Sequence, residues 1–503
     1  MLRNRRPKVA ESPEDNIEID VSLVKNMERL QEQLRDCGDL AVTRIKTAGG
    51  RDVNVLFIDG LVDYDLIQRD VLPTLLKLKN IDSEAFKDNR VFPVIRYERI
   101  LILEEAVDKI FRGSTVVLID GLDYAFSFEL QRIEARPIEE PTTERILKGH
   151  HDGFVESASR NIAIVRSKIS SSKLKVKKLT IGKRSRSVVA ILYMEDIANP
   201  EIIGRVEERL NKIEFDNIGA AGTIEQLISD NPFSIFPQHQ ATERPDKAIA
   251  NLLEGRIVLL IDSTPVSLIL PVDYFQFYQT PDDYNVNFYF GSFLRLLRFI
   301  GSAIAVVLPA LYIAILTFHY QTIPLDLLVP LAESRSRVPF PPIIEALIME
   351  VSFELLREAS IRLPSTLGPT IGIVGGLVLG QTAVQAGIVS NIMVVIVGIT
   401  AIATFVVPQY DMGLILRVSR FIYMINAALF GVVGVAIYFL LSMAHLVSLE
   451  SYGQPYLQPI APFKAKDLKD IFIRGPLTSY SLRPDIARPK DKTRGRGYTG
   501  DKQ

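Results

Sequence analysis

The sequence predicts a chain of two unlike parts: a cytoplasmic α/β region of two related subdomains, followed by an α-helical transmembrane bundle. One observation is a long run without charged residues, 363–410, in the C-terminal half of the 503-residue chain. The other is a set of four apolar segments before residue 290, each ending near an acidic residue, which is typical of buried strands. The formal net charge of −1 averages over these parts and says little about binding partners.

The uncharged run is long enough for two membrane helices. It is about twice the roughly 20 residues that cross a bilayer core as a helix. A small polar turn at 387–391 divides it, and an uncharged apolar run lies on either side of it. The sequence therefore predicts about four spans, at residues 299–318, 367–388, 391–408 and 421–446.

Basic residues near the span ends indicate the orientation, because Lys and Arg are enriched on the cytoplasmic side. Arg295 and Arg298 precede the first span, and more basic residues follow the last one: Lys464, Lys466, Lys469 and Arg474. Both ends of the bundle should then face the cytoplasm, which requires an even number of crossings. Arg417 and Arg420, before the last span, argue the other way.

The soluble region contains an internal repeat. A helical pattern leads through a glycine into an apolar strand that ends in Asp, once with Gly113 and Asp120 and once with Gly255 and Asp262. We expect five parts: an N-terminal extension and leading helix (1–40), a first α/β subdomain (41–150), a second (151–290), a transmembrane region (291–450) and a basic cytoplasmic tail (451–503).

Acidic residues follow the predicted strands: Asp59, Asp120, Asp196 and Asp262. They are candidates for a ligand site, since α/β sheets often bind ligands where strands end. The alternative is that an Asp after a strand simply makes a turn. We expect no metal or cofactor site, because His150 and His151 are adjacent and cannot share a helix face. No catalytic motif is present, so we expect no enzyme of a motif-bearing class.

A basic stretch, residues 168–186, contains no acidic residue. It could contact anionic lipid or another subunit, or it could be a solvated strand or loop. No aromatic residues interleave with its charges, which disfavours binding of single-stranded nucleic acid.

A charged helix is predicted at 341–363, between the first two spans. Glu350, Glu354 and Glu358 share one face, and the spacing favours pairing of Glu354 with Arg357 and of Glu358 with Arg362. Each charge near a bilayer centre costs about 2.5–3.5 kcal/mol on insertion scales, so we expect this helix at the membrane interface. The alternative is a ring of carboxylates at a pore mouth in an oligomer. The candidate charge network is Glu345, Glu350, Glu354, Arg357, Glu358 and Arg362.

The second span carries small and polar residues at helical spacing. Glycines recur every fourth residue, which allows close helix contact. The amides that follow need partners in hydrocarbon, so they either bond to another helix or line a polar pore. The candidate pore or packing residues are Gly372, Val374, Gly376, Val378, Gly380, Gln381, Thr382 and Gln385.

Four blocks together resemble the GerA-family spore germination proteins, the A subunits of germinant receptors. They are RPIEEPTTERILKGHHDGF, FPQHQATERPDKAIANLLEGRIVLLIDSTP, RVPFPPIIEALIMEVSFELLREASIRLP and IGIVGGLVLGQTAVQAGIVS. The matching positions are Glu140, Pro141, Glu144, Gly149, Gly153, Phe154, Glu243, Arg244, Pro245, Asp262 and Pro265. The chain departs from the family pattern at His150 and His151, where a Pro-Arg-like pair is expected, and at Ser263, which replaces a usual Gly.

The resemblance implies a nutrient receptor in the inner membrane of a bacterial endospore. It implies a transporter-like B subunit and a lipoprotein C subunit as partners, a homo-oligomer that releases ions on triggering, and no catalytic residues, cofactor or nucleic acid. Two alternatives stay open. The chain could be a non-conducting scaffold that relays the germinant signal to a separate channel, or a membrane-anchored α/β ligand sensor that uses the strand-end acids.

Overall fold

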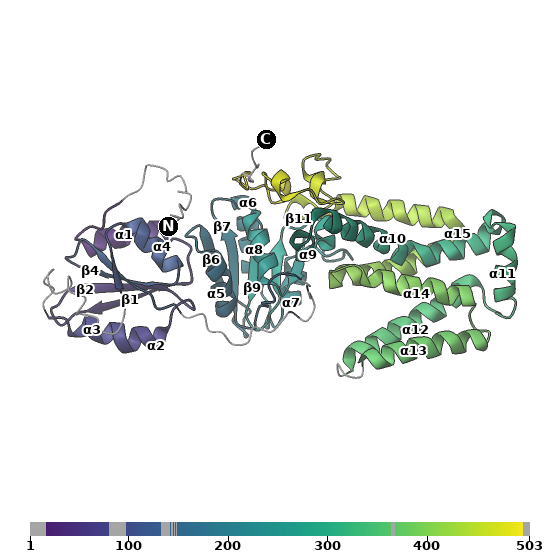
Figure 1. Cartoon of the computed structure of the whole chain (residues 1–503), viewed down its shortest axis with the longest axis horizontal. Coiled ribbons are helices and arrows are strands. Elements are labelled where there is room, and N and C mark those ends of the chain that lie inside the picture. The colour runs from purple at the N-terminus through teal and green to yellow at the C-terminus, as the bar shows by residue number, and fades with distance from the viewer. Residues whose placement is uncertain are drawn as a thin grey trace, which may run out of the picture.

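The computed structural model describes residues 17–79, 97–131, 141, 144, 146, 148–363 and 368–495. Two α/β subdomains follow one another along the long axis of the molecule, and an array of helices extends from the second (Figure 1). The C-terminal tail returns to the base of the helices, beside the second subdomain. The prediction of an α/β region followed by a helical region is confirmed.

Each subdomain contains one five-stranded sheet, and the two sheets share one connectivity: β1-β2-β4-β5-β3 in the first and β6-β7-β9-β10-β8 in the second. The first subdomain comprises α1 (Leu23–Gln33), β1 (Leu40–Lys46), β2 (Asp52–Ile58), α2 (Tyr64–Leu66), the π-helix η1 (Ile67–Val71), α3 (Leu72–Lys77), β3 (Tyr97–Ile100), α4 (Leu103–Phe111), β4 (Thr115–Ile119) and β5 (Ala125–Phe128). The second comprises α5 (Ala158–Lys168), β6 (Leu174–Ile181), β7 (Ser187–Met194), α6 (Pro200–Asn211), α7 (Ala221–Ile228), β8 (Gln240–Thr242), α8 (Pro245–Leu253), β9 (Ile257–Ile261) and β10 (Ser267–Leu270).

The central strands are mostly apolar because helices cover both faces of each sheet. On β2, Leu56 and Ile58 pack with α1 and α4, whereas Val53, Val55 and Phe57 pack with the helices on the opposite face. The second sheet has the same two cores, one with α5 and α8 and one with α6 and α7. A strand buried on both faces reads as a continuous apolar run, which explains the predicted strands.

The internal repeat extends to the hydrogen bonds at helix starts. Asp120 Oδ1 accepts from the backbone N–H of Leu23 at the start of α1, and Asp262 Oδ1 accepts from that of Ala158 at the start of α5, both at 3.1 Å. A carboxylate at a helix N-terminus satisfies an otherwise unpaired N–H and interacts favourably with the helix dipole. These two acids therefore have a structural role in both copies.

The strand-end acids do not converge on one edge, because every strand pair in the described sheets is antiparallel. Asp120 follows β4 and lies beside Asp52, at the end of the sheet opposite Asp59. In the second sheet, Asp262 lies beside Val188 at the start of β7. Asp196 follows β7 at the opposite end of that sheet. These acids therefore do not meet at one edge of a sheet, as residues at the carboxyl ends of parallel strands would.

The two subdomains are joined by a buried ion pair. Arg166 of α5 donates from Nε and Nη2 to the two carboxylate oxygens of Asp39 at 2.7 and 3.0 Å, and both side chains are almost fully buried. The guanidinium also lies 4.7 Å from the Phe111 ring centroid. The basic stretch 168–186 contains the whole of β6 at this boundary, where Lys175 is buried and donates to the Gln33 carbonyl.

The helical region begins after the 3-10 helix η2 (Tyr274–Tyr278) and the short α9 (Pro281–Asn285). Its helices are α10 (Phe288–Phe318), α11 (Leu325–Arg335), α12 (Pro342–Arg362), α13 (Gly368–Gln385), α14 (Asn391–Phe405) and α15 (Tyr410–Ser448), with the 3-10 helix η3 (Tyr320–Thr322) after α10. Among the described residues, α10 and α15 are long and apolar enough to cross a membrane. The predicted helices at 341–363, 367–388 and 391–408 correspond to α12, α13 and α14.

The α15 segment is a helical hairpin. A straight 39-residue helix would be about 58 Å long. Yet Gln409, next to its first residue, bonds to Ala241, and His445, near its last, bonds to Ser234 of the same subdomain. The chain reverses at Gly431, whose φ of 62° and ψ of −145° are not helical. The predicted span at 421–446 therefore covers parts of two antiparallel helical arms instead of one continuous helix.

Two features of the hairpin confirm the reversal. The rings of Tyr423 and Tyr438, one on each arm, have centroids 4.6 Å apart. A Cβ on Gly434 would collide with the carbonyl oxygen of Asn426 on the other arm. Glycine is thus required at 434 by close approach and favoured at 431 by its positive φ.

The tail after α15 packs on the second subdomain. It contains the two-stranded β11 (Glu450–Ser451) and β12 (Gln454–Pro455) and the 3-10 helices η4 (Asp467–Asp470), η5 (Leu477–Ser479) and η6 (Asp485–Ala487). Tyr452 is fully buried: its carbonyl accepts from Arg205, and its hydroxyl lies 2.9 Å from His239 Nε2.

Candidate functional site

Two of the residues picked out by sequence, Glu144 and Arg244, lie where the second subdomain meets the helices. Glu144 accepts from Lys247 Nζ at 2.6 Å, and the same ammonium lies 3.2 Å from the Gln409 side-chain oxygen just before α15. Gln409 in turn donates to the Ala241 carbonyl at 2.8 Å. We call Glu144, Arg244, Lys247 and Gln409 the motif junction. It ties the start of α8 to the start of α15.

Arg244 holds the loop before α5 in place. Its guanidinium is buried, pairs with Asp246 at 2.7 Å and donates to the carbonyls of Glu144 and His150. The nearby Gly149 leaves no room for a side chain, since a Cβ would lie 2.8 Å from Asn285 Nδ2. Since these bonds go to backbone carbonyls, the motif fixes loop geometry.

The remaining motif positions surround this junction. Phe154 donates its backbone N–H to Glu243, Pro245 begins α8, and Asp262 caps α5. Glu140 lies outside the described residues. Ser263 adopts a φ of +69°, and its counterpart in the first copy is Gly121 with a φ of +89°.

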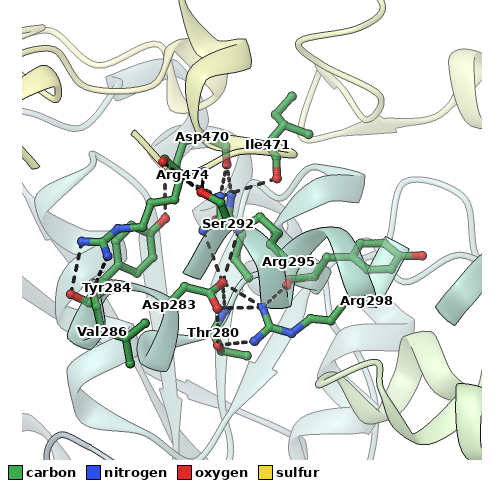
Figure 2. A network of polar contacts seen from close by, with 12 residues as sticks. Thr280, Asp283, Tyr284, Val286, Ser292, Arg295, Arg298, Asp470, Ile471 and Arg474 are labelled. Carbon is green, nitrogen blue, oxygen red and sulfur yellow. Dashed lines mark hydrogen bonds and ion pairs between the residues drawn. The ribbon is translucent and has the colours of Figure 1, made fainter. Parts of the chain in front are cut away.

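A second polar cluster joins the base of α10 to α9 and to the tail (Figure 2). Asp283 is fully buried and accepts from Arg298 Nη1 at 2.8 Å and from Arg295 Nη2 at 3.3 Å. Arg295 Nη1 also pairs with Asp470 of the tail at 2.8 Å. Arg474 donates to the Val286 carbonyl at 2.6 Å. We call Asp283, Arg295, Arg298, Asp470 and Arg474 the basal junction.

The basal junction was visible in the sequence only in part. Arg295, Arg298 and Arg474 were interpreted as orientation signals, whereas the structure pairs each of them with α9, the tail or both. Asp283 and Asp470 were missed. The available signal for Asp283 was the capping box that it forms with Thr280, a Thr followed three residues later by Asp.

Inside the helical array, the acids of α12 pair with other helices. Glu350 and Arg420 of α15 form a buried ion pair, and Arg420 Nη2 donates to Thr404 at 2.9 Å. Glu354 pairs with Arg417 at 3.0 Å, so the predicted Glu354–Arg357 pair is wrong. Glu358 and Arg362 pair at 2.7 Å as predicted, on the exposed side.

The other members of the predicted charge network also have identified neighbours. Glu345 is buried and accepts from the Ser390 backbone N–H at 3.2 Å. Arg357 lies over the Phe405 ring at 4.6 Å. These long-range partners compensate charges that would otherwise be costly in hydrocarbon.

The glycine face of α13 packs against neighbouring helices. A Cβ on Gly376 would contact Phe353 of α12 at 3.7 Å, one on Gly372 would contact Ser360 at 3.7 Å, and one on Gly380 would contact Val394 of α14 at 3.3 Å. The four-residue spacing therefore serves helix contact within one chain.

The polar face of α13 lies at the edge of the array. Its exposed side chains are Val378, Gln381, Thr382 and Gln385. They recur at the spacing of one helix face. The side chain of Val374 lies outside the described residues.

Two titratable side chains near the junctions are perturbed by burial. Burial lowers the pKa of His239 to about 3, which keeps this ring neutral beside Tyr452. Burial, and to a smaller extent the negative charge of Asp411 at the start of α15, raise the pKa of Glu225 on α7 to about 7. Glu225 is thus an ionisable group at the contact between the soluble and helical regions.

The sequence of the chain matches a known protein family. Residues 28–486 match the family model described as Bacillus/Clostridium GerA spore germination protein. Spore germination protein B1 of Bacillus subtilis (strain 168) is 37% identical, over 95% of this chain and 100% of that protein. Spore germination protein KA of the same organism is 39% identical, over 95% and 88%.

A solved structure also resembles part of the chain. The N-terminal domain of the A subunit of the Bacillus megaterium spore germinant receptor GerK3 is 25% identical, with a TM-score of 0.41. The match covers 51% of this chain and 96% of that domain.

Proposed function

Because this chain belongs to the GerA family of spore germination proteins, we propose that it is the A subunit of a nutrient germinant receptor that triggers endospore germination. The proposal places it in the inner membrane of the spore, with the α/β region in the cytoplasm. A transporter-like B subunit and a lipoprotein C subunit would be its partners.

We propose that the helical array crosses the bilayer six times, through α10, α12, α13, α14 and the two arms of α15. In this proposal α12 spans the membrane and does not lie at its interface, where the sequence led us to expect it. The support is that successive helices begin at opposite ends of the array, alternately near the soluble region and far from it. The start of α12 meets the start of α14 through Glu345 and Ser390, far from the soluble region. Both ends of the α15 hairpin return to the second subdomain. Six crossings retain the even number required by basic residues at both ends.

The chain would oligomerise into a nutrient-gated ion-release channel. The observation that carries this proposal is the exposed polar face of α13, Val378, Gln381, Thr382 and Gln385. Amides facing lipid are costly because hydrocarbon offers no hydrogen-bond partner. If copies assemble around an axis, these faces turn to the centre and can line a hydrated path.

The test is ion flux from proteoliposomes that contain the full chain, alone and with the B and C subunits. Val378→Ala and Gln385→Leu should change the flux, because both alter the polar face. Val433→Ala is the matched control, since Val433 is similarly exposed but lies on the second arm of α15. Equal effects of all three changes would contradict the pore assignment.

A non-conducting scaffold is the second candidate, and the two junctions favour it. The hydrogen bond of Lys247 to Gln409 and the buried ion pair of Asp283 with Arg295 connect the soluble region to the helices, which suits a relay of mechanical signals. Absence of flux from an intact oligomer with B and C present would support this function. The ligand-sensor alternative is weakened, because Asp120 and Asp262, two of its four strand-end acids, accept hydrogen bonds at helix starts.

A further inference from the structure

A cavity of about 870 Å³ lies between α12, α13, α14 and the start of α15. Pockets of this size typically hold small molecules and are mostly apolar with a few placed polar groups. The lining fits this description, with Phe353, Leu356, Ile361, Leu363, Ala401 and Phe405 among its members. The Glu350–Arg420 pair forms the buried floor, whereas Ile361 and Tyr410 are exposed at the end nearer the soluble region.

The charges at this cavity favour an anion. Two carboxylates, Glu350 and Glu354, are each paired with a guanidinium, of Arg420 and Arg417 respectively. Arg357 adds a third guanidinium, which contacts Phe405 and has no acidic side chain within ion-pair distance among the described residues. The cluster therefore has an excess of one positive charge. Arg357, which carries it, lies one helical turn after Phe353 on the same face of α12.

We propose that this cavity binds one anionic phospholipid of the surrounding bilayer, with its phosphate beside Arg357 and an acyl chain along Phe353, Leu356 and Phe405. Basic pockets between membrane helices on the cytoplasmic side are typical sites for anionic head groups. The apolar lining favours a lipid over a water-soluble anion, because each buried methylene adds to the affinity. This lipid site is separate from the proposed ion release, and the proposal does not depend on whether the chain conducts ions.

The absence of tryptophan from the chain provides a direct test. Ile361→Trp places the chain's single tryptophan in the cavity wall, where its fluorescence can be excited selectively over that of the tyrosines. The full chain is reconstituted in phosphatidylcholine vesicles that contain a small fraction of brominated phosphatidylglycerol or, in the matched sample, of brominated phosphatidylcholine. The anionic brominated lipid should quench the fluorescence several-fold more strongly than the zwitterionic one at equal mole fraction.

Two further variants separate the site from surface charge. Arg357→Gln should make the two lipids equally effective, and Arg357→Lys should retain most of the preference because the charge is kept. Arg362→Gln, an exposed arginine near the same end of α12, should leave the preference unchanged.

Four results would overturn the proposal. Equal quenching by both lipids would show no selectivity, and an effect of Arg362→Gln equal to that of Arg357→Gln would show only surface attraction. Loss of the preference on adding inorganic phosphate would indicate a soluble anion. No quenching by either lipid would show that another copy or part of the chain fills the cavity.

Discussion

The two repeats of the soluble region share one strand connectivity but differ in the parts of the molecule that they contact. Residues 102–120 align without a gap with residues 244–262, and both segments run from a helix start through a glycine to a capping Asp. At the helix start, Ile102 and Glu105 of the first copy correspond to Arg244 and Lys247 of the second. A few side chains at one helix start thus make the second copy the attachment point for the helices.

The difference continues beyond the last strand of each sheet. In the second copy, the chain after β10 passes through η2 and α9 into the basal junction at Asp283. In the first copy, β5 is followed by a short contact of Gln131 with Val62 on the same subdomain. Changes at the second copy should therefore loosen the soluble region from the helices, whereas changes at the matching positions of the first should not.

The largest effect is expected from Asp283→Asn. The change leaves the buried Arg298 without its carboxylate and removes one of two from Arg295, and breaking a buried pair typically costs about 3–5 kcal/mol. Thermal unfolding of the full chain in detergent, with limited proteolysis between the two regions, measures the loss. Asp282→Asn is the control, because Asp282 is less buried, and it should change little. A similar loss in both variants would contradict a special role of the basal junction.

The motif junction should be the next most sensitive. Lys247→Met keeps the aliphatic stem but removes the bonds to Glu144 and Gln409, which should destabilise the docked state by about 1.5–3 kcal/mol. The matching change in the first copy, Glu105→Met, alters an exposed side chain and should stay within about 0.5 kcal/mol. The same thermal measurement compares the two, and equal losses would show that the repeats are not differentiated at this position.

A third, pH-dependent effect is expected at Glu225 on α7. Its pKa is raised from 4.5 to about 7, so the folded chain holds a proton that the unfolded chain releases between these values. Stability should therefore fall as the pH rises from about 4.5 to 7, by about 1–2 kcal/mol after allowance for partial exposure. Glu225→Gln should remove this fall, while Glu201→Gln on the exposed side of α6 should retain it. An unchanged pH profile in Glu225→Gln would exclude this residue as its source.

The comparison of the repeats also shows how far the sequence could predict the structure. The repeat, the two glycines and the capping acids were predictable because a buried strand and a helix leave local patterns. The connectivity of the strands was not, because an apolar run of the same length suits a parallel or an antiparallel neighbour. The sequence alone therefore could not decide whether Asp59 and Asp120 lie at the same end of the sheet.

The helical region was predictable in extent but not in path. The reversal at Gly431 falls inside a run with no charged residue, where a turning glycine looks the same as a packing glycine. The partners of Glu350 and Glu354 are about 60–70 residues away in α15, beyond the reach of helical spacing. The basal junction depends on Asp470 for the same reason: its partner Arg295 lies far away in the sequence.

The smallest effect concerns the backbone at Ser263, and it tests whether the two copies share one conformation after the capping acid. Ser263 holds a φ of +69°, at a cost of about 1–2 kcal/mol for a non-glycine residue, whereas Gly121 adopts the matching φ of +89° freely. Ser263→Gly removes this cost but adds about 0.5–1 kcal/mol of chain entropy to the unfolded state, so the net gain should be about 0.5–1 kcal/mol. Gly121→Ser should lose a similar amount in the first copy, with some displacement of the Arg51 side chain, which a Cβ there would meet. Thermal midpoints of the two single variants and of the exchange variant that carries both decide the matter. If the copies share one conformation, the two shifts have opposite signs and nearly cancel in the exchange variant, because the sites are distant and independent.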